Sequence, residues 1–156
     1  EQILPELEKK RELQKNKEEA IVFEGKKGIN EIYTTILESG GKEYNTFGGG
    51  KRVTYDVMGE TWWKNLHIKR IAKKIPSRQV FDETIRKFGQ ELNKLPLTKI
   101  KFLSQEFEQL TETAICGDYV AISIFTENPY GLLIKDKVVV DGYKKQFELI
   151  WKNAKN

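Results

Sequence analysis

Two short stretches of this sequence, a glycine-rich run and a histidine–lysine pair, contain residue types that bind anions or react with phosphorus. Residues 46–52 read T-F-G-G-G-K-R, and His67 and Lys69 follow within L-H-I-K-R. Successive glycines leave backbone N–H groups open to an anion, and the cations Lys51 and Arg52 would neutralise its charge. A histidine beside a lysine can attack phosphorus while the lysine holds a phosphate oxygen. Both patterns indicate phosphate chemistry. Comparing the spacing of their residues with known phosphate-binding motifs tests this interpretation.

The glycine-rich stretch lacks the spacing of the common nucleotide-binding loops. The pattern G-x-x-x-x-G-K-[ST] would require glycine at position 45 and a hydroxyl at 52, where Asn45 and Arg52 stand. The dinucleotide pattern G-x-G-x-x-G fails because Val53 occupies its last position. Two interpretations remain, an anion site or a flexible connection between a strand and a helix, and the second is favoured. The ligand-binding residues of the first would be Gly49, Gly50, Lys51 and Arg52.

The His-Ile-Lys run resembles half of the phospholipase D superfamily signature, H-x-K-x-x-x-x-D, of which two copies must converge. Position 74, where the aspartate belongs, is Lys74, and His67 is the single histidine, so a second copy would have to come from a dimer. The surrounding sequence predicts a helix over 59–74, on which residues two apart point about 200° apart. His67 and Lys69 would lie on opposite sides, so we predict no catalytic residues.

The same predicted helix brings aromatic and basic residues together at i, i+3 and i+4 spacings. Trp63, Lys64, His67, Arg70 and Lys74 share one such face. In the simpler interpretation a tryptophan packs in the core and the cations are solvated. In the second, the face is a pocket wall, where Trp63 stacks on a ligand and His67 or Arg70 binds an anionic or hydroxyl group. A third use of this face is nucleic-acid binding.

Composition narrows the class of protein. The chain has 156 residues, of which 38% are hydrophobic and 32% are charged, as expected for one folded domain with a charged surface. No apolar stretch approaches the roughly 20 residues that cross a bilayer, and no secretory signal is visible, so we expect a cytoplasmic protein without membrane contact. One cysteine and one histidine are too few for a zinc site, and we expect no metal and no cofactor. A net charge of +4 permits anionic partners without requiring them.

The order of the predicted elements indicates an α/β fold. We expect a mixed sheet flanked by helices, in which strand–helix repeats are followed by an antiparallel meander and a closing helix. Before it, residues 1–19 are charged, with a thin apolar set that includes Leu4 and Leu7, and indicate an exposed connector or coiled helix. The predicted strands are 20–23, 43–47, 78–82, 98–103, 111–116, 119–125 and 132–136, and the predicted helices are 26–39, 59–74, 83–93 and 139–154.

Several segments resemble the C-terminal domain of TrmB-type transcriptional regulators, which are mostly archaeal. They are A-I-V-F-E-G-K-K-G-I-N-E-I-Y, W-W-K-N-L-H-I-K-R-I-A-K-K-I-P-S-R-Q-V-F-D-E-T, T-A-I-C-G-D-Y-V-A-I-S-I-F and the tail from P-Y-G-L-L-I-K-D to W-K-N-A-K. The resemblance implies a phospholipase D-like fold without catalytic residues. It also implies a homodimer that contacts DNA through an N-terminal winged helix-turn-helix, which is absent from this chain. Residues 1–19 would be the tail of the linker helix, with Leu4 and Leu7 as dimer contacts, and residues 20–156 the regulatory domain.

The expected function is therefore effector sensing and dimerisation within a DNA-binding transcriptional regulator. The family's effectors are sugars or other small metabolites. Its sugar-binding members have a longer C-terminal extension, so the resemblance does not imply sugar specificity here. Two alternatives are a phospholipase D-like phosphodiesterase or nuclease that acts as a dimer through His67, and a nucleic-acid-binding module.

Overall fold

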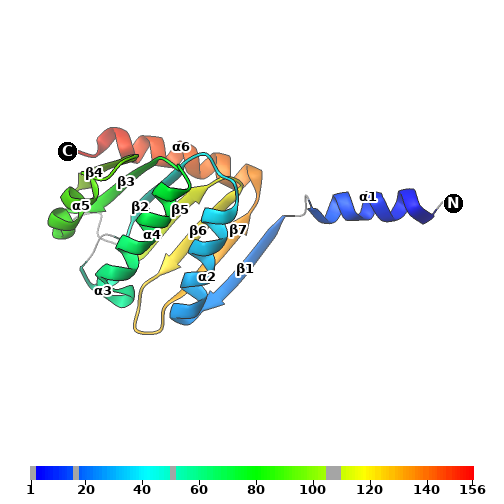
Figure 1. The fold of residues 1–156 in the computed structure, drawn as a ribbon, viewed down its shortest axis with the longest axis horizontal. Coiled ribbons are helices and arrows are strands. Elements are labelled where there is room, and N and C mark those ends of the chain that lie inside the picture. The colour runs from blue at the N-terminus through cyan, green and yellow to red at the C-terminus, as the bar shows by residue number, and fades with distance from the viewer. Residues whose placement is uncertain (1–2, 16–17, 50–51, 105–109) are drawn as a thin grey trace.

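The chain folds around one mixed sheet that lies between two layers of helices (Figure 1). A computed structural model describes residues 3–15, 18–49, 52–104 and 110–156. The helices are α1 (Ile3–Lys15), α2 (Gly25–Glu38), α3 (Arg52–Met58), α4 (Glu60–Ala72), the 3-10 helix η1 (Glu83–Ile85), α5 (Arg86–Leu92) and α6 (Lys137–Asn153). The strands are β1 (Glu19–Glu24), β2 (Tyr44–Gly48), β3 (Ser77–Asp82), β4 (Thr98–Leu103), β5 (Thr111–Cys116), β6 (Tyr119–Ile124) and β7 (Tyr130–Lys135).

The sheet has the order β1-β7-β6-β5-β2-β3-β4, and its two halves differ in direction. Strands β2, β3 and β4 are parallel, as expected for strands joined through helices. Strands β5, β6 and β7 form an antiparallel meander, and β5 also pairs antiparallel with β2. This confirms the predicted fold class: strand–helix repeats, then a meander, then a closing helix.

Two hydrophobic clusters hold the layers on the sheet. The larger cluster lies under α2, α3, α4 and α5, and contains residues such as Ile32, Trp63 and Phe88. The smaller cluster lies under α6, where Val140 and Phe147 pack on Val80 and Ile115. Since alternate residues of a strand face opposite sides, each central strand contributes to both clusters. The sheet is thereby covered on both faces over its centre.

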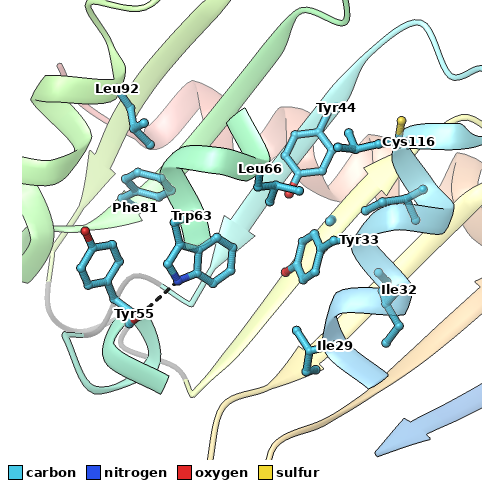
Figure 2. Packing of buried hydrophobic residues seen from close by; sticks show 14 of the residues in the cluster. Ile29, Ile32, Tyr33, Tyr44, Tyr55, Trp63, Leu66, Phe81, Leu92 and Cys116 are labelled. Atoms are coloured by element: carbon cyan, nitrogen blue, oxygen red, sulfur yellow. Dashed lines mark hydrogen bonds between the residues drawn. The ribbon is translucent and has the colours of Figure 1, made fainter. Parts of the chain in front are cut away.

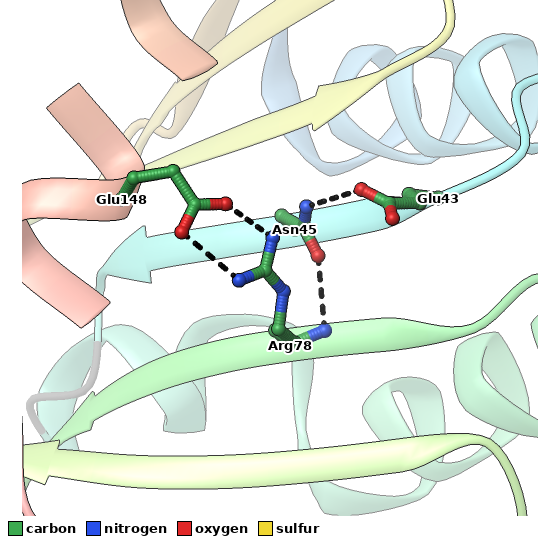
Figure 3. Close-up of polar contacts among 4 residues, drawn as sticks. All are labelled: Glu43, Asn45, Arg78 and Glu148. Atoms are coloured by element: carbon green, nitrogen blue, oxygen red, sulfur yellow. Dashed lines mark hydrogen bonds and ion pairs between the residues drawn. The ribbon is translucent and has the colours of Figure 1, made fainter. Parts of the chain in front are cut away.

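Helix α6 is also attached by polar contacts at the surface. Arg78 on β3 forms a bidentate ion pair with Glu148 on α6 (Figure 3). Its guanidinium lies 5.0 Å from the centre of the Phe147 ring. Asn45 on β2 accepts a hydrogen bond from the backbone N–H of Arg78 at 3.0 Å, and donates one to Glu43 at 3.1 Å. These contacts join β2, β3 and α6 at one end of the sheet.

The short apolar run A-I-V-F is typical of a buried strand, but this expectation is wrong for β1. It lies at the edge of the sheet, where it pairs with β7 only, and Ile21 and Val22 are 45% and 60% exposed. The apolar run A-I-V-F predicts a strand, but it does not distinguish a central strand from an edge. Beyond β1, α1 extends away from the sheet with Ile3, Leu4 and Leu7 exposed (Figure 1).

A short helix was missed between the glycine-rich stretch and α4. The sequence predicts a flexible connection there, but α3 begins at Arg52 and packs on α4, with Tyr55 buried in the larger cluster. Seven residues are too few to give a clear helical period, which explains the omission. Among the described residues, no helix combines the length and the apolar character that a membrane span requires.

Candidate functional site

Helix α4 has an inner and an outer face, and its three residues that were expected to bind a ligand all lie on the inner face. Trp63, His67 and Arg70 are buried at 6%, 2% and 0% exposure, whereas Lys69 is exposed. The helical geometry therefore places His67 and Lys69 on opposite sides, as predicted. The inner face belongs to the core, and the outer face borders a pocket.

Arg70 is the most deeply buried charge on the inner face. Its Nη1 donates to the carbonyl oxygens of Ile75 at 2.6 Å and Leu97 at 3.0 Å, and its Nη2 donates to Thr98 Oγ1. Its Nε donates to His67 Nδ1 at 3.3 Å. A planar guanidinium can make these bonds at once because its donors are held in a fixed fork. Arg70 thus ties the end of α4 to the connection before β4.

The two turns that Arg70 joins have an unusual backbone. Lys74 has φ 59° and Leu97 has φ 57°, a region that residues other than glycine rarely adopt. Arg70 binds the carbonyl that follows Lys74 and the carbonyl of Leu97 itself. We therefore assign it a structural role that offsets the strain of both turns.

His67 is held neutral beside Arg70. Burial, and secondarily the positive charge of Arg70, lower the pKa of its imidazole from 6.5 to about 3. Its ring meets Tyr44 edge-on, with the ring centres 6.3 Å apart. A neutral, enclosed imidazole that accepts a hydrogen bond from Arg70 does not face a substrate.

Trp63 packs at the centre of the larger cluster (Figure 2). Its indole N–H donates to the carbonyl oxygen of Tyr55 at 3.2 Å, and its ring meets those of Tyr33 and Phe125 edge-on. The polar and aromatic contacts of this side chain are thus made inside the protein. Ligand binding by Trp63, His67 and Arg70 stays a prediction, and their burial favours a role in supporting a pocket wall.

The predicted basic face is only partly at the surface, because Lys64 and Lys74 are exposed but Arg70 is buried. Arg70 points inward, and Lys64 forms ion pairs with Glu60 at 2.6 Å and Glu91 at 3.6 Å. The sequence shows which residues share a face of the helix, but the sheet determines which face is covered. The nucleic-acid interpretation consequently loses its main cation.

The glycine-rich stretch lies over a buried acid. Gly48 and Gly49 have φ 78° and 65°, and a Cβ on Gly49 would lie 2.6 Å from Cβ of Glu112. Glycine is therefore required for both the backbone conformation and the close approach. Arg52 is exposed and pairs with Asp56 at 3.3 Å. Gly50 and Lys51 lie outside the described residues, so the predicted anion site stays a prediction.

Glu112 is the functional candidate that the sequence analysis missed. It is 5% exposed on β5, and its carboxylate accepts a hydrogen bond from the Tyr33 hydroxyl at 2.6 Å. Burial raises the pKa of Glu112 to about 7, although the Tyr33 hydrogen bond acts in the opposite direction. Alternation along T-E-T-A-I-C places Glu112 on the same face as Ala114 and Cys116, and this could have revealed its burial.

A pocket of about 340 Å³ opens between α2 and α4. Helix α2 contributes Asn30, Tyr33 and Leu37 to its lining, and α4 contributes Trp62, Leu66 and Lys69. Figure 2 shows Tyr33 beside Leu66 and Trp63 in the packed core that borders this pocket. The pocket thus combines an apolar floor with a polar rim, as small-molecule sites commonly do.

Comparisons with known proteins show which solved structures share this fold. No family model matches the chain, and no curated protein sequence matches it either. Among solved structures, NucT from Helicobacter pylori matches with a TM-score of 0.69 at 11% identity, over 90% of this chain and 99% of that chain. Nuc from Salmonella typhimurium, a phospholipase D family member, matches with a TM-score of 0.60 at 11% identity, over 89% of this chain and 97% of that chain.

The third matching structure has a longer chain than this one. TrmBL2, described as an archaeal chromatin protein with a novel mode of DNA binding, matches with a TM-score of 0.63 at 15% identity. The match covers 99% of this chain, which spans 65% of the TrmBL2 chain. All three likenesses concern the same mixed sheet with helices on its faces, at identities that establish architecture alone. The chain therefore has a phospholipase D-like fold.

Proposed function

We propose that this chain is the effector-sensing and dimerisation domain of a DNA-binding transcriptional regulator of the TrmB type. The proposal rests on one observation, which is how much of this chain each structural match covers. The TrmBL2 match covers 99% of the chain, and therefore includes most of α1, whereas the NucT and Nuc matches cover 90% and 89%. The inclusion of α1 in the TrmBL2 match favours the regulator over the nuclease.

The geometry of His67 supports a role without catalysis. In the phosphodiesterase alternative this histidine attacks phosphorus, with Lys69 beside it. Here His67 is buried, its pKa is lowered to about 3, and Lys69 lies on the other side of α4. A second copy of the chain cannot bring these two groups together, because they diverge on one rigid helix. The likeness to NucT and Nuc supports the alternative at the level of the fold, whereas the placement of His67 and Lys69 disfavours it.

Helix α1 is the proposed linker to the DNA-binding part. Its apolar residues Ile3, Leu4 and Leu7 are 69%, 67% and 49% exposed, and they lie within two turns on one side. The rest of the described part of α1 is mostly charged. An exposed narrow stripe of this kind pairs with a second helix in coiled coils, which supports a homodimer.

The DNA test uses a gene product that carries a winged helix-turn-helix before Glu1. At equal salt concentration, we expect the longer protein to bind duplex DNA at least about tenfold more tightly than this chain alone. The measurement is fluorescence anisotropy with a labelled duplex over a salt series. Equal affinities would contradict the regulator proposal. They would instead support the alternative of a nucleic-acid-binding module.

The dimer test replaces Leu4 and Leu7 together by glutamate. Four charges in a paired-helix seam should raise the dimer dissociation constant by more than about a hundredfold, because the apolar burial is lost and like charges repel. Sedimentation velocity over a concentration series measures this shift. Lys9→Glu is the control, since it adds an acid away from the apolar stripe. A dimer that both variants leave intact would contradict the role of α1.

A further inference from the structure

We propose that the pocket between α2 and α4 binds a small anionic metabolite with a flat ring, and that Trp62 and Lys69 select it. The inference rests on the proposed function, because it names the effector class and the effector site. A volume of about 340 Å³ lies at the lower end of the range for small-molecule sites. The pocket therefore suits one ring with its substituents, and not a polymer.

Trp62 provides the flat wall. Its indole N–H donates to Asn30 Oδ1 at 3.1 Å, and its ring meets Tyr33 edge-on with the ring centres 5.3 Å apart. Its ring also meets Trp63 edge-on at 4.8 Å. These contacts, from both α2 and α4, fix the indole while it stays partly exposed. A rigid aromatic surface loses little entropy when a ring packs on it.

Lys69 provides the charge. Within the described part of the chain, its ammonium group forms no ion pair, although it lines the pocket and is exposed. The other lysine of the lining, Lys73, pairs with Glu38 at 3.1 Å, and Glu38 is the one acid of this lining. The pocket thus has an excess positive charge at its rim. A carboxylate or phosphate complements it, and a neutral or cationic ligand does not.

The polar groups around this cation favour hydrogen-bonding substituents on the ligand. Asn65 and Thr34 line the pocket from opposite helices, and Asn30 uses its side-chain oxygen for Trp62. Its amide nitrogen therefore stays available as a donor. Leu37 and Leu66 close the apolar side. In the described part of the chain, a flat apolar wall, a cation without an ion-pair partner and amide groups together define the ligand class.

The pocket is well placed to influence the linker. Helix α2 starts at Gly25, directly after β1, and α1 precedes β1. A ligand held by both α2 and α4 acts on α2, which directly follows the six residues of the edge strand β1. The floor residue Tyr33 also connects the pocket to Glu112 on β5. Occupancy can thus act on β1, the strand that α1 precedes in the chain.

Two pairs of probes test the site. Indole-3-acetate and adenosine 5′-monophosphate carry a ring and an anion, and indole-3-acetamide and adenosine are their uncharged counterparts. With this 156-residue chain, saturation-transfer NMR titrations should show the anions binding about tenfold more tightly than the uncharged probes, the effect of one charge-assisted contact. Lys69→Gln should abolish this preference, and Trp62→Leu should weaken both members of each pair.

Lys145→Gln is the matched control, because it removes an exposed lysine on α6 across the sheet. Its probe affinities should equal those of the unchanged chain. A preference that survives in Lys69→Gln, or the absence of binding by all four probes, overturns the pocket assignment. Sedimentation velocity on the same samples distinguishes the two proposals: a dimer without probe binding rejects the pocket alone. A monomer that still binds the anions rejects the dimer instead.

Discussion

Replacing Arg70 by alanine should lower the free energy of unfolding by about 3–5 kcal/mol, because several buried acceptors lose their donor and a large side chain leaves a cavity. The substitution leaves the carbonyls of Ile75 and Leu97 without their donor inside the protein. It also removes the donor to His67 Nδ1 and leaves a cavity. The two turns at positive φ lose the group that joins them.

Urea unfolding, followed by tryptophan fluorescence, measures the effect of Arg70→Ala. Lys69→Ala is the control, because it lies one position earlier on the same helix with its side chain in solvent. We expect it to change stability by less than about 0.5 kcal/mol. Arg70→Lys should fall between the two, since an ammonium group keeps the charge but cannot reproduce the fork. A loss below about 1 kcal/mol in Arg70→Ala would contradict the structural role.

Replacing Glu112 by glutamine should remove a pH dependence of stability of about 3 kcal/mol. The folded-state pKa of Glu112 is raised to about 7 from 4.5, so the folded protein holds this proton more tightly than the unfolded chain. Its contribution to stability is fully present below pH 4.5, and it is lost as the pH rises towards 7. Glutamine stays neutral and can still accept the Tyr33 hydrogen bond.

His67 contributes with the opposite sign. Its folded-state pKa is lowered to about 3 from 6.5, so its contribution is present above pH 6.5 and is lost as the pH falls towards 3. Between pH 4.5 and 6.5 the two groups oppose each other. In Glu112→Gln, the pH effect of Glu112 is absent and that of His67 remains. The free energy of unfolding should therefore rise with pH between 4.5 and 6.5 more steeply than in the unchanged chain.

Denaturant unfolding at pH 4.5 and pH 8.5 tests the role of Glu112. The advantage of Glu112→Gln over the unchanged chain should be about 3 kcal/mol larger at pH 8.5 than at pH 4.5. Glu127→Gln is the control, because Glu127 is exposed between β6 and β7. An advantage of Glu112→Gln that does not vary with pH would show that the carboxyl is ionised in both states.

The sequence predicts local structure well in this protein. The apolar alternation of the strands and the helical period of residues 59–74 both have counterparts in the structure, and the opposite orientations of His67 and Lys69 follow from that period. Properties that depend on distant packing could not be predicted. Trp62 and Trp63 are adjacent, and only the position of α2 decides which indole enters the core and which lines the pocket.

The candidate site was less predictable than the fold for the same reason. Arg70 looks like a surface cation because no nearby acid is visible, but its partners are carbonyl oxygens, including one that lies 27 residues along the chain. Glu112 meets Tyr33 across 79 residues. The Gly-rich stretch indicates an anion site by composition, whereas Gly49 makes room for the Glu112 side chain. Such contacts exist only once the strand order is known.

The pairing of β1 with β7 determines when β1 can join the sheet during synthesis of the chain. Glu19 lies opposite Lys135, so β1 finds its partner only after residue 135 has left the ribosome. Pairing over such a separation closes a long loop and forms late. A DNA-binding part placed before α1 would fold first and remain on a loose tether during synthesis. It would acquire a fixed position only when the last strand is added.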